Sequence, residues 1–250
     1  RTVGKLHYYH LDGTEVKKIR MTDLNVGINY NPGVTYVNTK QQRLPINLDS
    51  PEIGLSHTMG FKGFMGGQYH SNITKLSIYK RQWLGSWGYL DFHANAQAQW
   101  NKVPFQMLIM PPINLSYFEQ EETVSMMKDW EFLNDRQVFW ALSWDMNGKL
   151  LNRIPLIKKL KWREWLAIKG VYGHLTDKNN PFLEKNKNDD TIFLFPKGSD
   201  VMGNTPYWEC VVGVHNIFKF FAVEYVRRLT YINRPGIHKG GVRFNFMMSF

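Results

Sequence analysis

Strict alternation of apolar and polar residues is the feature that most constrains how this chain can fold. Residues 89–101 show it most clearly. A period of two belongs to a β-strand, because successive side chains point to opposite faces. Soluble strands typically have about 5–6 residues, so this length suits a tilted membrane strand. The apolar positions are Leu90, Phe92, Ala94, Ala96, Ala98 and Trp100, and the polar or amphipathic positions are Tyr89, Asp91, His93, Asn95, Gln97, Gln99 and Asn101.

The last residues, 242–250, repeat the pattern and end on an aromatic side chain. A strand with apolar residues facing out, polar residues facing in and a terminal Phe is typical of the last strand of a bacterial outer-membrane β-barrel. Phe244, Phe246 and Phe250 are therefore expected to form a signal for the barrel-assembly machinery. The apolar face of this strand carries Val242, Phe244, Phe246, Met248 and Phe250.

Further alternating segments predict an all-β protein, a transmembrane antiparallel up-and-down β-barrel of the outer-membrane type. They lie at 21–30, 52–62, 68–84, 137–147, 162–173, 207–215 and 221–231. Bacterial barrels have even strand numbers from about 8 upward, and roughly ten strands are expected here. Because Arg1 begins in mid-pattern, residues 1–250 are expected to be one barrel domain or the C-terminal portion of a larger barrel.

Two expected strands fit the pattern poorly. Ile73 falls on the polar face of 68–84, which a β-bulge could correct. Arg227 falls on the apolar face of 221–231, where a charge facing mid-membrane lipid costs about 2–4 kcal/mol. Arg227 is therefore expected to contact a partner protein, an extracellular loop or a lipid phosphate, unless the register differs there.

The connections between expected strands have unequal lengths. Those at 104–136 and 174–206 are long, whereas 84–88 and 216–219 are short. If Phe250 ends at the periplasmic side, both long connections lie outside the cell, as in bacterial barrels. The segment 148–161 is the exception: its leucines and lysines indicate either the surface of the inner leaflet or a turn packed on the barrel mouth.

Charge and cysteine content exclude several classes of protein. The formal net charge is +10, but the one dense basic cluster, within 149–163, has no nucleic-acid motif around it. A solvated turn is the favoured interpretation of this cluster, with lipid phosphates as the alternative. The single cysteine, Cys210, allows no disulfide framework or thiolate metal cluster.

No arrangement of residues predicts catalysis, a cofactor or a metal. The acidic residues of 104–136 lack a histidine partner and favour a solvated loop. His7 and His10 are too few for a zinc site, which needs four donors. The polar faces of the strands mix both signs of charge, which favours a plugged interior over an ion-selective pore. These inward-facing residues are expected to be Asp91, His93, Asn95, Gln97, Asp145, Arg163, Lys169, Glu209, Glu224 and Arg228.

Three stretches carry a resemblance to a known family. Residues 151–164 (LNRIPLIKKLKWRE), 209–218 and 225–231 (YVRRLTY) are similar to segments of Bacteroidota outer-membrane barrels described as carboxypeptidase-like regulatory-domain proteins. The resemblance covers most of 50–250. It implies an outer-membrane location in a Gram-negative bacterium, a non-catalytic barrel of unknown function, and an upstream regulatory-type domain that this chain lacks.

Three functional hypotheses follow. The first is a non-enzymatic barrel that acts as a subunit or accessory partner of an outer-membrane complex, by kinship one for barrel assembly or surface-protein export. The second is a pore or transporter for a small solute, and the third an outer-membrane barrel hydrolase. The expected partners are outer-membrane lipids, other outer-membrane proteins and, during biogenesis, the assembly machinery, but not nucleic acid.

Overall fold

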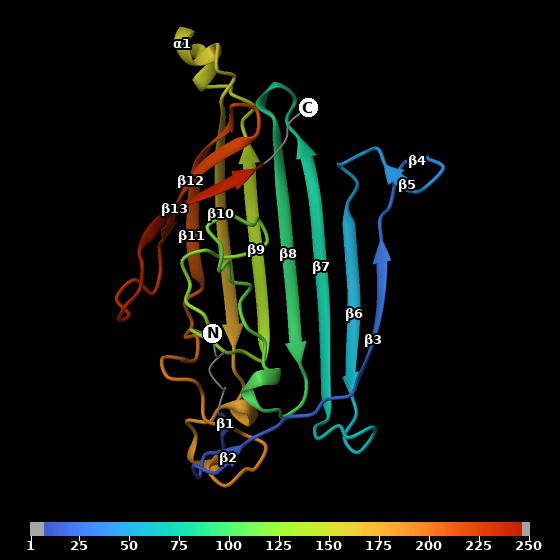
Figure 1. Ribbon diagram of the computed structural model, residues 1–250, viewed down its shortest axis with the longest axis vertical. Coiled ribbons are helices and arrows are strands. Elements are labelled where there is room, and N and C mark those ends of the chain that lie inside the picture. The colour runs from blue at the N-terminus through green and yellow to red at the C-terminus, as the bar shows by residue number, and fades with distance from the viewer. Residues whose placement is uncertain (1–7, 247–250) are drawn as a thin grey trace.

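The computed structural model describes residues 8–246, and in this range nine strands form a single antiparallel sheet. Consecutive strands are neighbours, in the order β13-β12-β11-β10-β9-β8-β7-β6-β3 (Figure 1). The strands of this sheet are β3 (Asp23–Tyr30), β6 (Glu52–Gly60), β7 (Ser71–Trp83), β8 (Tyr89–Gln99), β9 (Arg136–Asp145), β10 (Arg163–His174), β11 (Tyr207–Ile217), β12 (Phe221–Arg228) and β13 (Gly240–Phe246).

The remaining elements are short. Two small hairpins pair β1 (Tyr8–Tyr9) with β2 (Glu15–Val16), and β4 (Tyr36–Asn38) with β5 (Arg43–Pro45). The only α-helix in the described range is α1 (Pro155–Lys158), whose Pro155 stands at a favourable first-turn position. No helix in that range is long and apolar enough to cross a membrane. Short 3₁₀ turns occupy Gly85–Trp87, Phe105–Met107, Leu151–Arg153, Asp177–Asn179 and Glu184–Asn186.

The antiparallel all-β prediction is confirmed, and each strand lies within a few residues of its expected place. Closure into a barrel is not seen in the described residues, because β3 and β13 are the two edges of the sheet. The edge of β13 instead bonds to the chain's own long connection: Glu119 N–H donates to the Phe244 carbonyl (2.7 Å), and Phe244 N–H donates to Tyr117 (2.9 Å).

The expected bulge in β7 is wrong. β7 pairs with β6 and β8 without a register shift, so Ile73 lies on the same face as Lys75 and Ser77. The register shift in the sheet falls between Val214 and Ile217, in the β11–β12 pair.

Residues 103–135, here called the insert, lie across one face of the sheet (Figure 1). This face is called the inner face, and the opposite one the outer face. Two apolar clusters join the insert to the inner face of β9–β12. The first comprises Val124, Met127, Phe132, Phe139, Ala141, Val171, Met202 and Tyr207; the second comprises Met126, Trp165, Ala167, Val211 and Val226.

The connections gather at two ends of the sheet as expected. The insert begins and ends at one end of the sheet, together with 175–206 and the β1–β2 hairpin, and there a third apolar cluster holds Val103, Phe105, Leu175 and Phe193 together. The 3₁₀ turn at Gly85–Trp87, α1 and the β4–β5 hairpin lie at the other, called the α1 end (Figure 1).

Candidate functional site

One cross-strand row on the inner face carries charged side chains from four strands, together with a tyrosine and a histidine. Directly paired positions from β6 to β12 place these side chains in a line, because opposed residues have Cβ atoms about 4.5–5.5 Å apart. The row therefore spans both the part of the face that the insert covers and the part it leaves open. Its members are Glu52, Tyr79, His93, Ala141, Lys169, Glu209 and Arg228.

Lys169 binds the insert at the centre of this row. Its ammonium group pairs with the carboxylate of Glu119 and donates to the carbonyls of Gln120 and Thr123, both at 2.9 Å. Both charged side chains are only 3% exposed. A buried ammonium group needs this many partners, because an unpaired charge in a low dielectric is very unfavourable.

Glu209, next in the row, accepts backbone hydrogen bonds from the insert. The amides of Ser125 (2.9 Å) and Met126 (3.1 Å) donate to its carboxylate, as does the Tyr207 hydroxyl (2.9 Å). Arg228 ends the row with a two-pronged pair to Glu131, at 2.9 and 2.7 Å. Three buried charged groups of the sheet thus hold the insert, at 119, at 125–126 and at 131.

The predicted solvated acidic loop is wrong for its main members. Glu119, Glu131 and Asp135 are buried, each with specific partners. Asp135 accepts from the hydroxyl of Thr176 and the amide of Asn179. Sequence reasoning missed these pairs because the partners lie 41 to 97 residues away along the chain.

Most of the expected inward-facing residues do lie on the inner face and are paired there. Asp91 is bound by Arg81 through two hydrogen bonds, 2.7 and 2.5 Å long. Glu224 contacts His215 at 2.8 Å, beneath Trp165, whose ring stacks on the imidazole. Because His215 and Glu224 are almost fully buried, they cannot reach a substrate, and this pair gives no support to a hydrolase.

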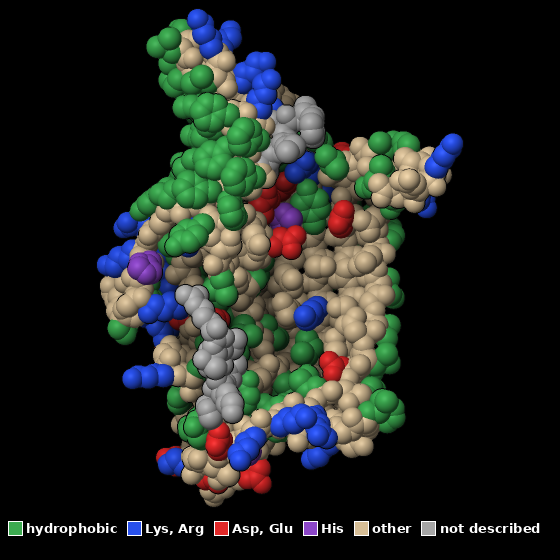
Figure 2. All heavy atoms as spheres, viewed as in Figure 1, with side chains coloured by type: hydrophobic (Ala, Val, Ile, Leu, Met, Phe, Trp, Pro, Cys, Tyr) green, Lys and Arg blue, Asp and Glu red, His purple; other side chains and the backbone are tan. Residues whose placement is uncertain are grey.

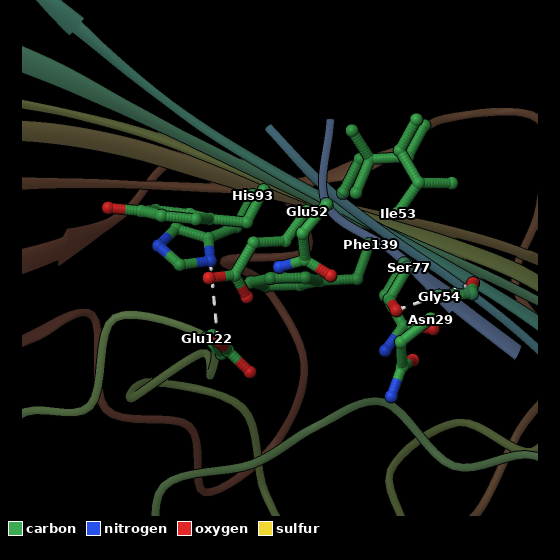
Figure 3. Close-up of a pocket in the computed structure, with 13 residues that line it drawn as sticks. Asn29, Glu52, Ile53, Gly54, Ser77, His93, Glu122 and Phe139 are labelled. Carbon is green, nitrogen blue, oxygen red and sulfur yellow. Dashed lines mark hydrogen bonds and ion pairs between the residues drawn. The ribbon is translucent and has the colours of Figure 1, made fainter. Parts of the chain in front are cut away.

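The inner face of β3 and β6–β8 is left open by the insert and is polar (Figure 2). A pocket of about 300 Å³ lies where the two parts meet. His93 projects into it from β8 and approaches Glu122 (3.3 Å) and Glu121 (3.7 Å) of the insert, with the Tyr79 ring 4.6 Å from its own. Figure 3 shows Asn29, Ser77 and Glu52 along the same wall.

Small and amide side chains continue this open surface toward the free edge. The polar side chains that line this surface can donate and accept hydrogen bonds, and Lys75 is the one charged residue among them. In the described residues no group of three or more His, Cys, Asp or Glu side chains could hold a metal ion. The lining residues include Asn25, Gly27, Asn29, Gly54, Ser56, Lys75, Ser77 and Asn95.

The outer face has the opposite character. Large apolar side chains lie exposed along the strands of the sheet from β3 to β13: Val26 is 54% exposed and Val212 is 55% exposed, whereas Lys169 and Glu209 on the inner face are buried. Soluble proteins seldom show a continuous apolar surface of this size. The exposed outer-face residues include Leu24, Val26, Ile28, Tyr30, Leu55, Leu76, Phe92, Val138, Leu142, Leu166, Ile168, Tyr172, Val212, Tyr225 and Val242.

The structure describes two of the three residues that are expected to form an assembly signal. Phe244 and Phe246 lie on the outer face of β13, opposite Val223 and Phe221. Phe246 is 57% exposed, and its ring lies 5.3 Å from that of Phe118. Phe250 lies outside the described residues.

Arg227 has the orientation that the alternation predicts. It is exposed on the outer face of β12, between Cys210 of β11 and Gly240 of β13. The register is therefore right, and the partner of this guanidinium group stays a prediction.

Fold and site define a class: an antiparallel all-β protein with an apolar outer face and a charged, internally paired inner face. Residues 9–110 match the family model described as "Family of unknown function (DUF5686) C-terminal domain". The match covers less than half of the chain, including β3 to β8. Comparisons with curated proteins and with solved structures give no match.

Proposed function

We propose that this chain is an integral protein of the outer membrane of a Gram-negative bacterium, with the sheet forming all or part of a transmembrane β-barrel wall. The inverted burial supports this most: apolar side chains are exposed on the outer face, and charged ones are buried on the inner face. In water the reverse is the rule, because burying apolar surface drives folding. In contact with lipid, exposed apolar side chains on the outer face carry no such free-energy cost.

Strand length agrees with a membrane span. The outer-face positions of β8 run from Leu90 to Ala98, and Trp100 follows. At about 3.3 Å per residue the ten steps from Leu90 to Trp100, which directly follows β8, span roughly 33 Å, or about 25 Å of membrane thickness at a tilt near 40°. Barrel proteins have an apolar band of about this height.

For the role of the protein, we propose a non-enzymatic subunit or accessory partner of an outer-membrane complex. β3 supports this, because all eight of its residues are exposed and one of its edges has no neighbouring strand in the described residues. Unpaired backbone groups are very unfavourable in lipid, so another strand, of this protein or of a partner, must cover this edge. Arg227, a charge on the apolar face, is a second position where a protein contact fits better than lipid.

The similarity of 151–164, 209–218 and 225–231 to Bacteroidota outer-membrane barrels supports the same role. That kinship makes complexes for barrel assembly or surface-protein export the first partners to test. Outer-membrane lipids and, during biogenesis, the barrel-assembly machinery complete the proposed partners. In this proposal the rings of Phe244 and Phe246, with Phe250, serve as the signal for that machinery.

The experiment is extraction and purification of the native complex. We expect the protein to resist carbonate extraction of outer membranes, and to co-purify with defined partners from a gentle detergent. An R227A variant should keep its membrane location and lose partner recovery, with R136A, a second outer-face arginine, as the matched control. Solubility in detergent-free buffer contradicts the membrane assignment, and recovery of free monomer alone contradicts the subunit role.

A pore for a small polar solute is the second candidate, and one observation favours it. The insert fills the inner face of β9–β12, but the polar inner face of β3 and β6–β8 remains open beside the pocket at His93. Single-channel conductance in planar bilayers separates the two roles. A steady open conductance supports the pore and counts against a purely accessory role.

A further inference from the structure

The connection between β9 and β10 carries the densest positive charge of the chain. Residues 149–163, here called the basic spur, comprise most of this connection and the first residue of β10, and they contain no Asp or Glu. Among the residues that the structure describes, Arg163 is the one member that approaches a carboxylate, that of Asp145, at 3.8 Å. The basic residues are Lys149, Arg153, Lys158, Lys159, Lys161 and Arg163.

The basic spur projects beyond the end of the sheet, with α1 at its tip (Figure 1). It is anchored at its base, where the carboxylate of Glu164 accepts the amides of Leu150 and Leu151, and Asn216 donates to the Lys161 carbonyl (2.7 Å). The tip is not packed against the sheet: Leu156 is 77% exposed and Leu160 is 51% exposed. The earlier alternative, a turn packed on the barrel mouth, therefore does not describe this segment.

Exposed aromatic side chains surround the base of the basic spur. Trp83 and Trp87 lie at the β7–β8 turn, and Phe218 and Phe220 at the β11–β12 turn, all exposed. The ammonium group of Lys149 lies 5.3 Å from the Trp87 ring centre. Barrel proteins place aromatic rings at the membrane–water boundary. Figure 2 shows Lys and Arg side chains at this end of the molecule, next to a patch of apolar side chains.

We propose that the basic spur binds the phosphate groups of anionic phospholipids in the leaflet at the α1 end, with Leu156 and Leu160 entering the lipid. The proposal rests on the membrane location proposed above. Two independent features select lipid over an acidic protein. The positive charges alternate with exposed apolar side chains, as in interfacial segments, and the aromatic belt fixes their depth. Each Lys or Arg near an anionic surface strengthens binding about fivefold.

Native mass spectrometry of the protein in a neutral detergent tests the proposal. The protein is titrated with phosphatidylglycerol and phosphatidylcholine of the same acyl chains, and lipid adducts are counted. Wild type is expected to prefer phosphatidylglycerol, and K158Q/K159Q to lower that preference by about fivefold or more.

The matched control is K185Q/K187Q, which removes the same charge from two exposed lysines that pair with Asp177 and Glu184. This control should keep the lipid preference. Equal loss in both double variants, or no preference in wild type, overturns the proposal. Because carbonate extraction reports membrane location separately, a membrane-embedded protein with no lipid preference refutes only this inference, whereas a freely soluble protein refutes the proposed function.

Discussion

Lys169 is one of the three buried charged residues of the sheet that hold the insert. Replacing it with Met leaves Glu119 buried without its counter-charge, which typically destabilises a protein by about 3–5 kcal/mol. We expect K169M to lower the free energy of unfolding, measured in urea with the protein in detergent or lipid, by this amount.

A double-mutant cycle supplies the control. E119Q/K169M removes both charges, so it should be less destabilised than the sum of the single variants. K185M, which breaks an exposed pair with Asp177, should change stability by only about 0–1 kcal/mol. Additive effects of E119Q and K169M would contradict the buried pairing.

Gly88 is the glycine, among those that the structure describes, whose added Cβ would stand closest to the main chain. Its φ is +79°, and an added Cβ would stand 1.9 Å from the Asp145 carbonyl oxygen. Backbone strain typically costs about 1–3 kcal/mol. We expect G88A to lower the free energy of unfolding by more than this, because the added Cβ clashes with the main chain. Gly85, also at positive φ but with open space around it, is the control, and G85A should cost about 1 kcal/mol. Equal melting shifts in the two variants would count against this turn geometry.

Asp189 gives the protein an acid-sensitive contact outside the sheet. Its partial burial raises its pKa, but hydrogen bonds from Lys102 and Thr191 outweigh this, and the net pKa is lowered. Because the pKa of Asp189 is lower in the folded state, the contact contributes its full stability above the unfolded pKa of 3.8. That stability is lost as the pH falls through the lower, folded pKa. Hydrogen exchange at 186–193, corrected for intrinsic rates, should therefore rise on acidification, and D189N should remove most of that pH dependence.

The insert behaves as part of the sheet's core and not as a mobile loop. The backbone amides of Ser125 and Met126 donate hydrogen bonds to the Glu209 carboxylate. Hydrogen bonds to charged groups contribute about 1.5–3 kcal/mol each to stability. We expect slow hydrogen exchange across 119–128 in the wild type. E209A should speed exchange there about tenfold or more and leave β7 and β8 unchanged, whereas E184A, at an exposed pair, should have no effect on this segment.

Alternation alone fixes which face of a strand each residue occupies, so the inward set and the exposed Arg227 could be predicted. Sequence does not show which residues share a row, because that depends on register between strands far apart in the chain. His93, Lys169 and Glu209 thus join one row only once β8 to β11 are paired. The packing of the insert on the sheet was missed for a related reason: Glu119 and Glu131 look like solvated charges until their distant partners are known.

At the scale of the whole molecule, the inverted burial predicts that lipid contacts the outer face and water the open inner face. Cys210, the only cysteine of the chain, lies on the outer face between Ile168 and Arg227. A fluorophore attached to Cys210 should be quenched by doxyl-labelled lipids and protected from iodide in reconstituted vesicles. In C210S/S77C the label moves to the open inner face and should respond in the opposite way, because Ser77 lines the polar surface. Iodide quenching at Cys210 as strong as at position 77 would mean that both faces contact water, and the membrane assignment would fail.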